Sequence, residues 1–183
     1  MKHKCIFLDK DGTLIYDVPY NVNTDKIRFY NDIFAPLLRL SAAKFKLIII
    51  SNQSGIARGY FNEVALETAM QFIVEKLLLF GISIDAYYYC PHDELKSGPG
   101  CNCRKPSPQL LLQAAHDYNI DLSQSWMVGD ILTDVAAGNA AGCKTILLDR
   151  NGKEQLLPKT KEPLYCPDSI HLDFYDILKS IKI

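Results

Sequence analysis

Two carboxylates stand one residue apart near the start of the chain, in the segment Asp9-Lys10-Asp11-Gly12-Thr13. A carboxylate at the end of a buried strand can attack phosphorus and form an aspartyl-phosphate. A second carboxyl beside it can protonate the leaving oxygen and then deprotonate the attacking water. Gly12 permits the sharp turn that follows such a strand. An ordinary polar turn has the same appearance, so this segment alone leaves both interpretations open.

Later segments supply the groups that would complement these carboxylates. Ser51 can donate a hydroxyl hydrogen bond to a phosphoryl oxygen, and Lys105 offers a fixed positive charge near a helix start. Asp130 is an oxygen ligand suited to Mg²⁺, and Asp134 either supports that metal site or caps a helix. Together these groups meet the needs of phosphoryl transfer, which are positioned reactants and neutralised charge.

These residues require elements that bring them to one place. Short apolar runs typical of buried parallel strands alternate with helical patterns. The expected strands are 4–9, 46–51, 85–90, 125–129 and 143–149, and the expected helices are 31–44, 62–80, 107–118, 133–141 and the amphipathic stretch 169–181. This alternation predicts an α/β fold with a doubly wound parallel sheet. Ligands bind at the carboxyl ends of such strands, where Asp9, Ser51 and Asp130 stand.

A second cluster contains Cys90, His92, Cys101 and Cys103. Three sulfurs and one imidazole can close a tetrahedral zinc site with no open position, so the expected Zn²⁺ is structural. It would hold the loop 91–100, which is costly to order otherwise. The alternative is a chance cluster of reduced thiols.

The motifs, taken in order, resemble those of the haloacid dehalogenase superfamily over roughly residues 4–150. They are Asp9-Lys-Asp-Gly-Thr, Ser51-Asn, Lys105-Pro, and Gly129-Asp130 with Asp134. The resemblance implies a Rossmann-like α/β domain, with Asp9 as the nucleophile and Asp11 as the general acid and base. It also implies Mg²⁺ bound by Asp9, the Asp11 carbonyl and Asp130. An Asp at position 11 is typical of the phosphatase and phosphomutase branches.

Within the superfamily, Cys90-Pro-His92, Cys101-X-Cys103-Arg104-Lys105-Pro106 and the segment 51–59 resemble the zinc-loop phosphatases that act on a heptose bisphosphate. That resemblance implies removal of the 7-phosphate in the synthesis of a bacterial surface glycan. It places the substrate against the segments 17–20 and 51–54 and against Arg104, and the candidate contacts are Asp17, Tyr20, Asn52, Gln53, Ser54 and Arg104.

Histidinol-phosphate phosphatases share the zinc loop and the Cys-Arg-Lys-Pro segment but usually differ after Asn-Gln. Ile131 stands where the heptose enzymes often carry Lys or Arg, and the zinc loop has an intermediate length. Histidinol phosphate, or another small phosphoester, is therefore the alternative substrate. A catalytically dead, zinc-stabilised binding module is a third reading. The presence of Asp9, Asp11, Ser51, Lys105 and Asp130 argues against it.

The lengths between motifs leave no room for a separate cap domain. We therefore expect one capless domain over 1–183 with an open site, which favours hydrolysis over a mutase reaction. The 20 basic and 21 acidic residues form no block of like charge, so neither nucleic acid nor a membrane surface is an expected partner. No signal peptide or membrane span is recognisable. The expected protein is a cytoplasmic monomer whose partner is a small phosphorylated sugar.

Overall fold

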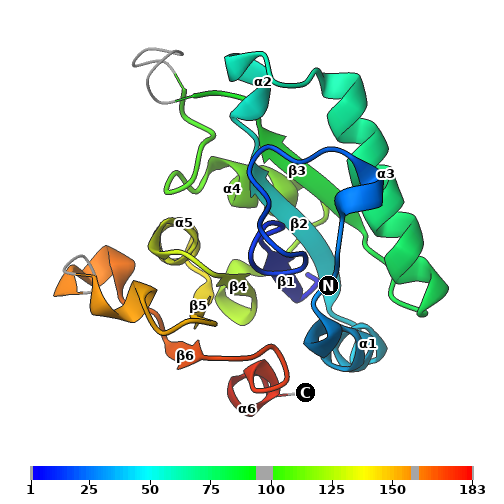
Figure 1. The fold of residues 1–183 in the computed structure, drawn as a ribbon. Helices are drawn as coiled ribbons and strands as arrows, with labels where there is room; N and C mark the ends of the chain where they lie inside the picture. Colours follow the sequence, from blue (N-terminus) through cyan, green and yellow to red (C-terminus); the bar gives the residue numbers. More distant parts are fainter. Residues whose placement is uncertain (1, 94–100, 158–160, 183) are drawn as a thin grey trace.

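The core of the fold is a six-stranded, all-parallel sheet in the order β3-β2-β1-β4-β5-β6 (Figure 1). The computed structural model describes residues 2–93, 101–157 and 161–182. The strands are β1 (Cys5–Leu8), β2 (Lys46–Asn52), β3 (Ala86–Cys90), β4 (Trp126–Gly129), β5 (Lys144–Leu148) and β6 (Ser169–His171). Strands β1 and β4 are buried along their whole length, as expected for parallel strands covered on both faces. The predicted doubly wound sheet is confirmed.

Helices connect the strands, and those expected over 31–44, 62–80, 107–118 and 133–141 are present near the expected positions, whereas the short helix over 55–58 was not expected. They are α1 (Phe34–Ala42), α2 (Gly55–Arg58), α3 (Glu63–Leu79), α4 (Gln109–Asp117), α5 (Leu132–Ala141) and α6 (Ile177–Ser180), with 3₁₀ turns η1 (Thr24–Lys26), η2 (Asn31–Ile33), η4 (Leu122–Gln124), η5 (Glu154–Leu156) and η7 (Pro163–Tyr165). The Asn62 side chain accepts a hydrogen bond from the Ala65 amide and so caps α3. Helix α5 ends at Gly142, whose positive φ of 84° suits a C-cap.

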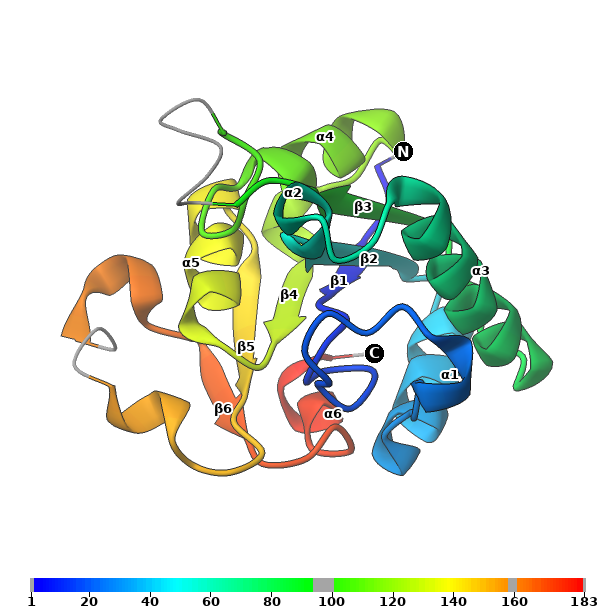
Figure 2. The ribbon, with the colours of Figure 1, turned by 45° about the horizontal axis from the view of Figure 1, so that its top comes forward.

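The helices form two layers around the sheet (Figure 2). Side chains of α1, α3 and α6 share one apolar cluster with one face of the sheet, through residues such as Leu37, Ile73 and Ile177. Side chains of α4 and α5 share a second cluster with the opposite face, through residues such as Leu111 and Ala137. Burial of these two faces from water is the main favourable term for the fold.

The expectation of one amphipathic stretch over 169–181 is wrong in its local structure. Residues Ser169–His171 form the edge strand β6, which pairs with β5, and only Ile177–Ser180 form a helix. The alternating pattern at the start of the stretch fits a strand, and Phe174 then turns fully buried into the core. The stretch still packs on the body of the domain, as expected.

The chain reverses its direction of winding between β1 and β4, which are neighbours in the sheet although two strands, β2 and β3, lie between them in the sequence. Such a switch point leaves a crevice at the carboxyl ends of the two strands. Residues 11–51, all described, contain only a loop, two 3₁₀ turns, α1 and β2, and thus no cap domain in this insertion. Residues 94–100 of the expected zinc loop lie outside the described residues. Among the described helices none has the length and apolar character to cross a bilayer.

Candidate active site

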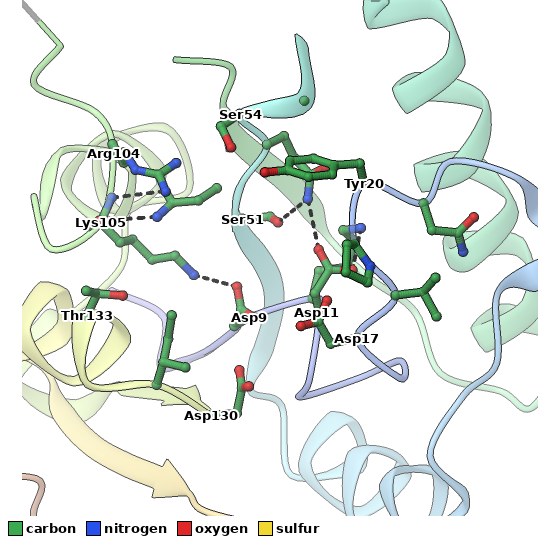
Figure 3. Close-up of a pocket in the computed structure, with 18 residues that line it drawn as sticks. Asp9, Asp11, Asp17, Tyr20, Ser51, Ser54, Arg104, Lys105, Asp130 and Thr133 are labelled. Atoms are coloured by element: carbon green, nitrogen blue, oxygen red, sulfur yellow. Dashed lines mark hydrogen bonds and ion pairs between the residues drawn. The ribbon is translucent and has the colours of Figure 1, made fainter. Parts of the chain in front are cut away.

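A cavity of about 390 Å³ opens at this switch point (Figure 3). Every residue predicted to act on or contact the substrate lines it, together with the predicted metal ligand Asp130. These are Asp9, Asp11, Asp17, Tyr20, Ser51, Asn52, Gln53, Ser54, Arg104, Lys105 and Asp130. The structure therefore brings residues from four distant segments together, although their roles remain predictions.

Asp9 follows β1 directly and is almost buried, with 8% of its surface exposed. Its Oδ1 accepts a hydrogen bond of 2.5 Å from the Lys105 ammonium, which also donates to the Ile50 carbonyl at 2.9 Å. Burial raises the pKa of the Asp9 carboxyl, while the Lys105 charge opposes that rise. The lysine is thus placed to contact both the proposed nucleophile and an incoming anion.

Asp130 and Asp134 face the same buried point from the end of β4 and the first turn of α5. Carboxylate oxygens of Asp9, Asp130 and Asp134 lie within 4.8 Å of one another. Burial, followed by the nearby charges of Asp9 and Asp134, raises the pKa of Asp130 to about 8. A cluster of oxygen donors with unfavourable ionisation is a suitable site for a hard cation such as Mg²⁺.

Asp134 has a structural role that the sequence left open. Its Oδ1 lies 2.6 Å from the Lys105 ammonium, and its Oδ2 accepts from the Ile131 amide at 3.3 Å. Although burial lowers the pKa of Lys105, the charges of Asp134 and Asp9 raise it well above its ordinary value. Asp134 therefore caps α5 and keeps Lys105 charged and in place.

Asp11 is held on the other side of the cavity by two neighbours. Lys10 lies 2.8 Å from Asp11 Oδ1, and the Gln53 amide donates to Asp11 Oδ2 at 3.0 Å. The same Gln53 nitrogen lies 2.8 Å from the Ser51 hydroxyl oxygen. Gln53, predicted as a substrate contact, therefore also links Asp11, the expected acid, to Ser51, the expected hydrogen-bond donor to the phosphoryl oxygens.

Asn52 holds the backbone of Lys105 in a similar way. The Asn52 Nδ2 donates to the Lys105 carbonyl at 3.2 Å, and the Lys105 amide donates to Asn52 Oδ1 at 3.0 Å. The side chain thereby joins the end of β2 to the segment before α4. Asn52 therefore holds the Lys105 backbone in addition to lining the cavity, and its predicted contact with the substrate stays a prediction.

The wall of the cavity at Tyr20 is connected to the start of the expected zinc loop (91–100), which is called the metal-ligand loop below. Arg58 donates to the Tyr20 hydroxyl and to the carboxylate of Asp93, and its guanidinium lies 5.4 Å from the Tyr20 ring centre. Asp93 follows the expected ligand His92 directly. Arg104 reaches the same loop, since its Nη1 donates to the His92 carbonyl at 3.4 Å.

The four expected zinc ligands converge. Sγ of Cys90 lies 3.5 Å from Sγ of Cys101 and 3.5 Å from Nδ1 of His92, while Cys103 Sγ lies 3.3 Å from that Nδ1. Around an ion with Zn–S bonds of about 2.3 Å, a tetrahedron has edges of about 3.8 Å. Burial raises the pKa of Cys101, but the backbone amides of Cys103 and Arg104 lower this pKa to about 7, which favours a thiolate. The donor set therefore fits one tetrahedral ion.

Sequence reasoning missed several residues at the site. Lys10 is buried against Asp11, and the Thr133 hydroxyl, at the cavity wall, is buried without a hydrogen-bond partner among the described residues. Arg58 was recognised only as part of the segment 51–59. Lys10 could have been suspected from its place between two aspartates, whereas the contacts of Arg58 and Thr133 have no local signal.

Comparison with known proteins agrees with this geometry. A family model described as HAD-hydrolase-like matches residues 102–175. D-glycero-β-D-manno-heptose-1,7-bisphosphate 7-phosphatase of Pasteurella multocida (strain Pm70) is 38% identical over 182 residues, covering 98% of this chain and 98% of that protein. The Escherichia coli (strain K12) protein of the same name is 37% identical over 181 residues, covering 97% of this chain and 93% of that protein.

Solved structures agree as well. The D,D-heptose 1,7-bisphosphate phosphatase of B. bronchiseptica, complexed with magnesium and phosphate, has a TM-score of 0.79 and 29% identity, with 97% of each chain covered. A Mesorhizobium loti protein described as a candidate HAD-like phosphatase has a TM-score of 0.77 and 32% identity, covering 81% of this chain and 73% of that one. The chain therefore belongs to the haloacid dehalogenase superfamily and, within it, to the family of the heptose-1,7-bisphosphate 7-phosphatases.

Proposed function

We propose that this protein is a phosphatase that removes the 7-phosphate from D-glycero-β-D-manno-heptose 1,7-bisphosphate. The observation that carries the proposal is the convergence of Asp9, Asp11, Lys105 and Asp130 on one cavity. The chain that forms this cavity is 38% identical, over nearly its full length, to the heptose-1,7-bisphosphate 7-phosphatase of Pasteurella multocida. The product would enter the synthesis of a bacterial surface glycan.

The proposed reaction has two steps. The Asp9 carboxylate attacks the phosphorus of the 7-phosphate, while Asp11 gives its proton to the departing sugar oxygen. Asp11 then takes a proton from water, which attacks the aspartyl-phosphate and returns Asp9 and inorganic phosphate. Lys105 and the Ser51 hydroxyl donate hydrogen bonds to the phosphoryl oxygens throughout.

We propose Mg²⁺ at Asp9, the Asp11 carbonyl and Asp130, because the carboxylate oxygens there suit a hard cation. When bound, Mg²⁺ supplies positive charge that offsets the charge of the phosphoryl oxygens. We also propose Zn²⁺ at Cys90, His92, Cys101 and Cys103, where all four donors are used and none remains open for chemistry.

The substrate is tested by comparing kcat/KM, with Mg²⁺ present, for both anomers of the heptose bisphosphate, histidinol phosphate and fructose 1,6-bisphosphate. We expect a preference of about a hundredfold for the β anomer over the α anomer. A comparable preference for the α anomer would contradict the proposed substrate. A clear preference for histidinol phosphate would replace the proposed substrate and would direct attention to Ile131, which lines the cavity and is 41% exposed.

The nucleophile is tested with Asp9→Asn, a nearly isosteric change. We expect it to abolish turnover of both the sugar phosphate and a generic aryl phosphate, while circular dichroism shows an intact fold. Turnover at the wild-type rate would contradict the assignment of Asp9. Absence of any Mg²⁺-dependent activity in the unmodified protein would favour the inactive binding module.

The cytoplasmic location, the monomeric state and the single domain over 1–183 remain predictions.

A further inference from the structure

The turn that carries Asp9 and Asp11 is held by a residue far away in sequence. Arg150, just beyond β5, donates from Nε to the Gly12 carbonyl and from Nη2 to the Thr13 carbonyl, each at 3.3 Å. It stands at the same edge of the sheet as the cavity. No motif of the sequence singles out this arginine, and it is absent from the lining of the main cavity.

The guanidinium of Arg150 is itself fixed by strong contacts. Its Nη1 and Nη2 donate to the two carboxylate oxygens of Asp32 at 2.6 and 3.1 Å. Its central carbon lies 3.7 Å from the ring centre of Tyr30. The Phe174 amide donates to Asp32 at 2.8 Å, which ties the pair to the C-terminal segment. A planar fork held by a carboxylate and an aromatic ring has little freedom to move, and lysine cannot reproduce it.

The turn that Arg150 holds is in close contact with a proposed metal ligand. A Cβ placed on Gly12 would lie 2.0 Å from Asp130 Oδ2, so the glycine backbone lies directly against that carboxylate. The Thr13 hydroxyl donates to Asp130 Oδ1 at 3.3 Å. Any shift of the Gly12 and Thr13 carbonyls therefore moves both Asp130 and the neighbouring Asp11.

We propose that Arg150, oriented by Asp32, is a positioning residue that fixes the catalytic turn against Asp130. In this role Arg150 sets the geometry of the magnesium site and of the acid Asp11 without contacting the substrate. The inference rests on the proposed function for its kinetic readout, but its metal-binding readout is independent of the substrate.

The test uses Arg150→Lys, which keeps the charge and removes the fork, and Asp32→Asn, which frees the fork with little change of volume. We expect each to lower kcat about tenfold or more and to raise the Mg²⁺ concentration for half-maximal activity about tenfold, with a small change in KM. Calorimetric titration of the full chain with Mg²⁺ should show the same loss of affinity. The double variant should lose little more than either single one, because both changes break one unit.

A matched control separates positioning from mere stability. The ion pair between Lys46 and Asp85, at 2.6 Å, is similarly half-buried but lies at the opposite edge of the sheet. Lys46→Met should lower Tm while leaving kcat and Mg²⁺ affinity unchanged. If Arg150→Lys and Asp32→Asn likewise lower only Tm, the inference is overturned. Should Arg150→Lys fail to fold, Asp32→Asn alone decides. Should the wild type prefer another phosphoester, the Mg²⁺ titration still decides.

Discussion

Gly12 combines two constraints at one position of the catalytic turn. Its φ of 81° lies in the left-handed region, which side chains disfavour, and its missing Cβ leaves the space that Asp130 Oδ2 occupies. The residue therefore does more than let the chain leave β1, which is the role that the sequence suggested. It allows a backbone segment and a carboxylate to touch.

We predict that Gly12→Ala lowers kcat/KM about a hundredfold through displacement of Asp130 and destabilises the fold by about 2 kcal/mol. Steady-state kinetics and denaturant unfolding measure the two effects. Gly142→Ala is the matched control, because Gly142 has a φ of 84° and its added Cβ would meet nothing within 4 Å. Equal kinetic losses in both variants would show that backbone strain, and not the contact with Asp130, causes the effect.

At the scale of single residues, the sequence predicted the groups that follow strands and missed those that act through other residues. Asp9, Ser51 and Asp130 could be found because parallel strands direct their carboxyl ends to one edge. The pairing of Lys105 with Asp134, and of Arg150 with Asp32, joins positions 29 and 118 residues apart. Such pairs depend on how side chains pack after folding, and neither spacing nor periodicity indicates them.

At the scale of elements, Asn52 joins the end of β2 to the segment before α4 by its paired hydrogen bonds to the Lys105 backbone. We predict that Asn52→Ala lowers kcat/KM by about tenfold or more, because the Lys105 backbone, and with it the Lys105 ammonium, is no longer held in position. We expect the same change to cost about 1–2 kcal/mol of stability. Asn62→Ala removes the cap of α3, away from the cavity, and should cost about 1 kcal/mol with unchanged kinetics. A kinetic loss in Asn52→Ala that is confined to KM would contradict the role of Asn52 in holding Lys105 and would favour direct contact with substrate.

The metal-ligand loop is the second element with a separable effect. We predict one tightly bound Zn²⁺ per chain. We expect Cys101→Ser to lower the zinc content and Tm markedly and to have only a small effect on kcat, because metal binding is coupled to folding. Elemental analysis and thermal unfolding measure these quantities. Cys166→Ser, at an exposed cysteine outside the cluster, is the control. Metal-replete protein without zinc would remove this account of the loop.

Secondary structure was predictable from pattern for five of the six strands and for the long helices. It failed at β6, where a strand of three residues and a short helix share one apolar stretch. Short edge elements take their conformation from the neighbour they pair with, here β5, and that neighbour is distant in sequence.

At the scale of the whole molecule, the buried carboxylates of the cavity oppose folding when no metal is bound. In the folded state the pKa of Asp130 is raised to about 8, whereas an unfolded Asp has a pKa of about 3.9. The folded metal-free protein therefore binds more protons than the unfolded chain between these values, and this contribution to stability falls as pH rises.

We predict that, in EDTA, Asp130→Asn is more stable than the wild type at pH 8 and that the difference shrinks towards pH 5. A Tm difference above about 3 °C is expected at pH 8, the shift that roughly 1 kcal/mol produces in a domain of this size. Added Mg²⁺ should stabilise the wild type and not the variant. A wild type that is the more stable protein in EDTA at pH 8 would show that Asp130 is compensated without the ion.

The same buried carboxylates bear on how this protein could be engineered. A screen that rewards heat resistance alone, in the absence of metal and substrate, would select amides at Asp9 or Asp130 and would return inactive proteins. Surface positions such as Leu79 and Val64, which are 77% and 73% exposed, carry no such conflict. Thermostable variants that still turn over substrate should therefore be sought on the outer helices, with the crevice between β1 and β4 left unchanged.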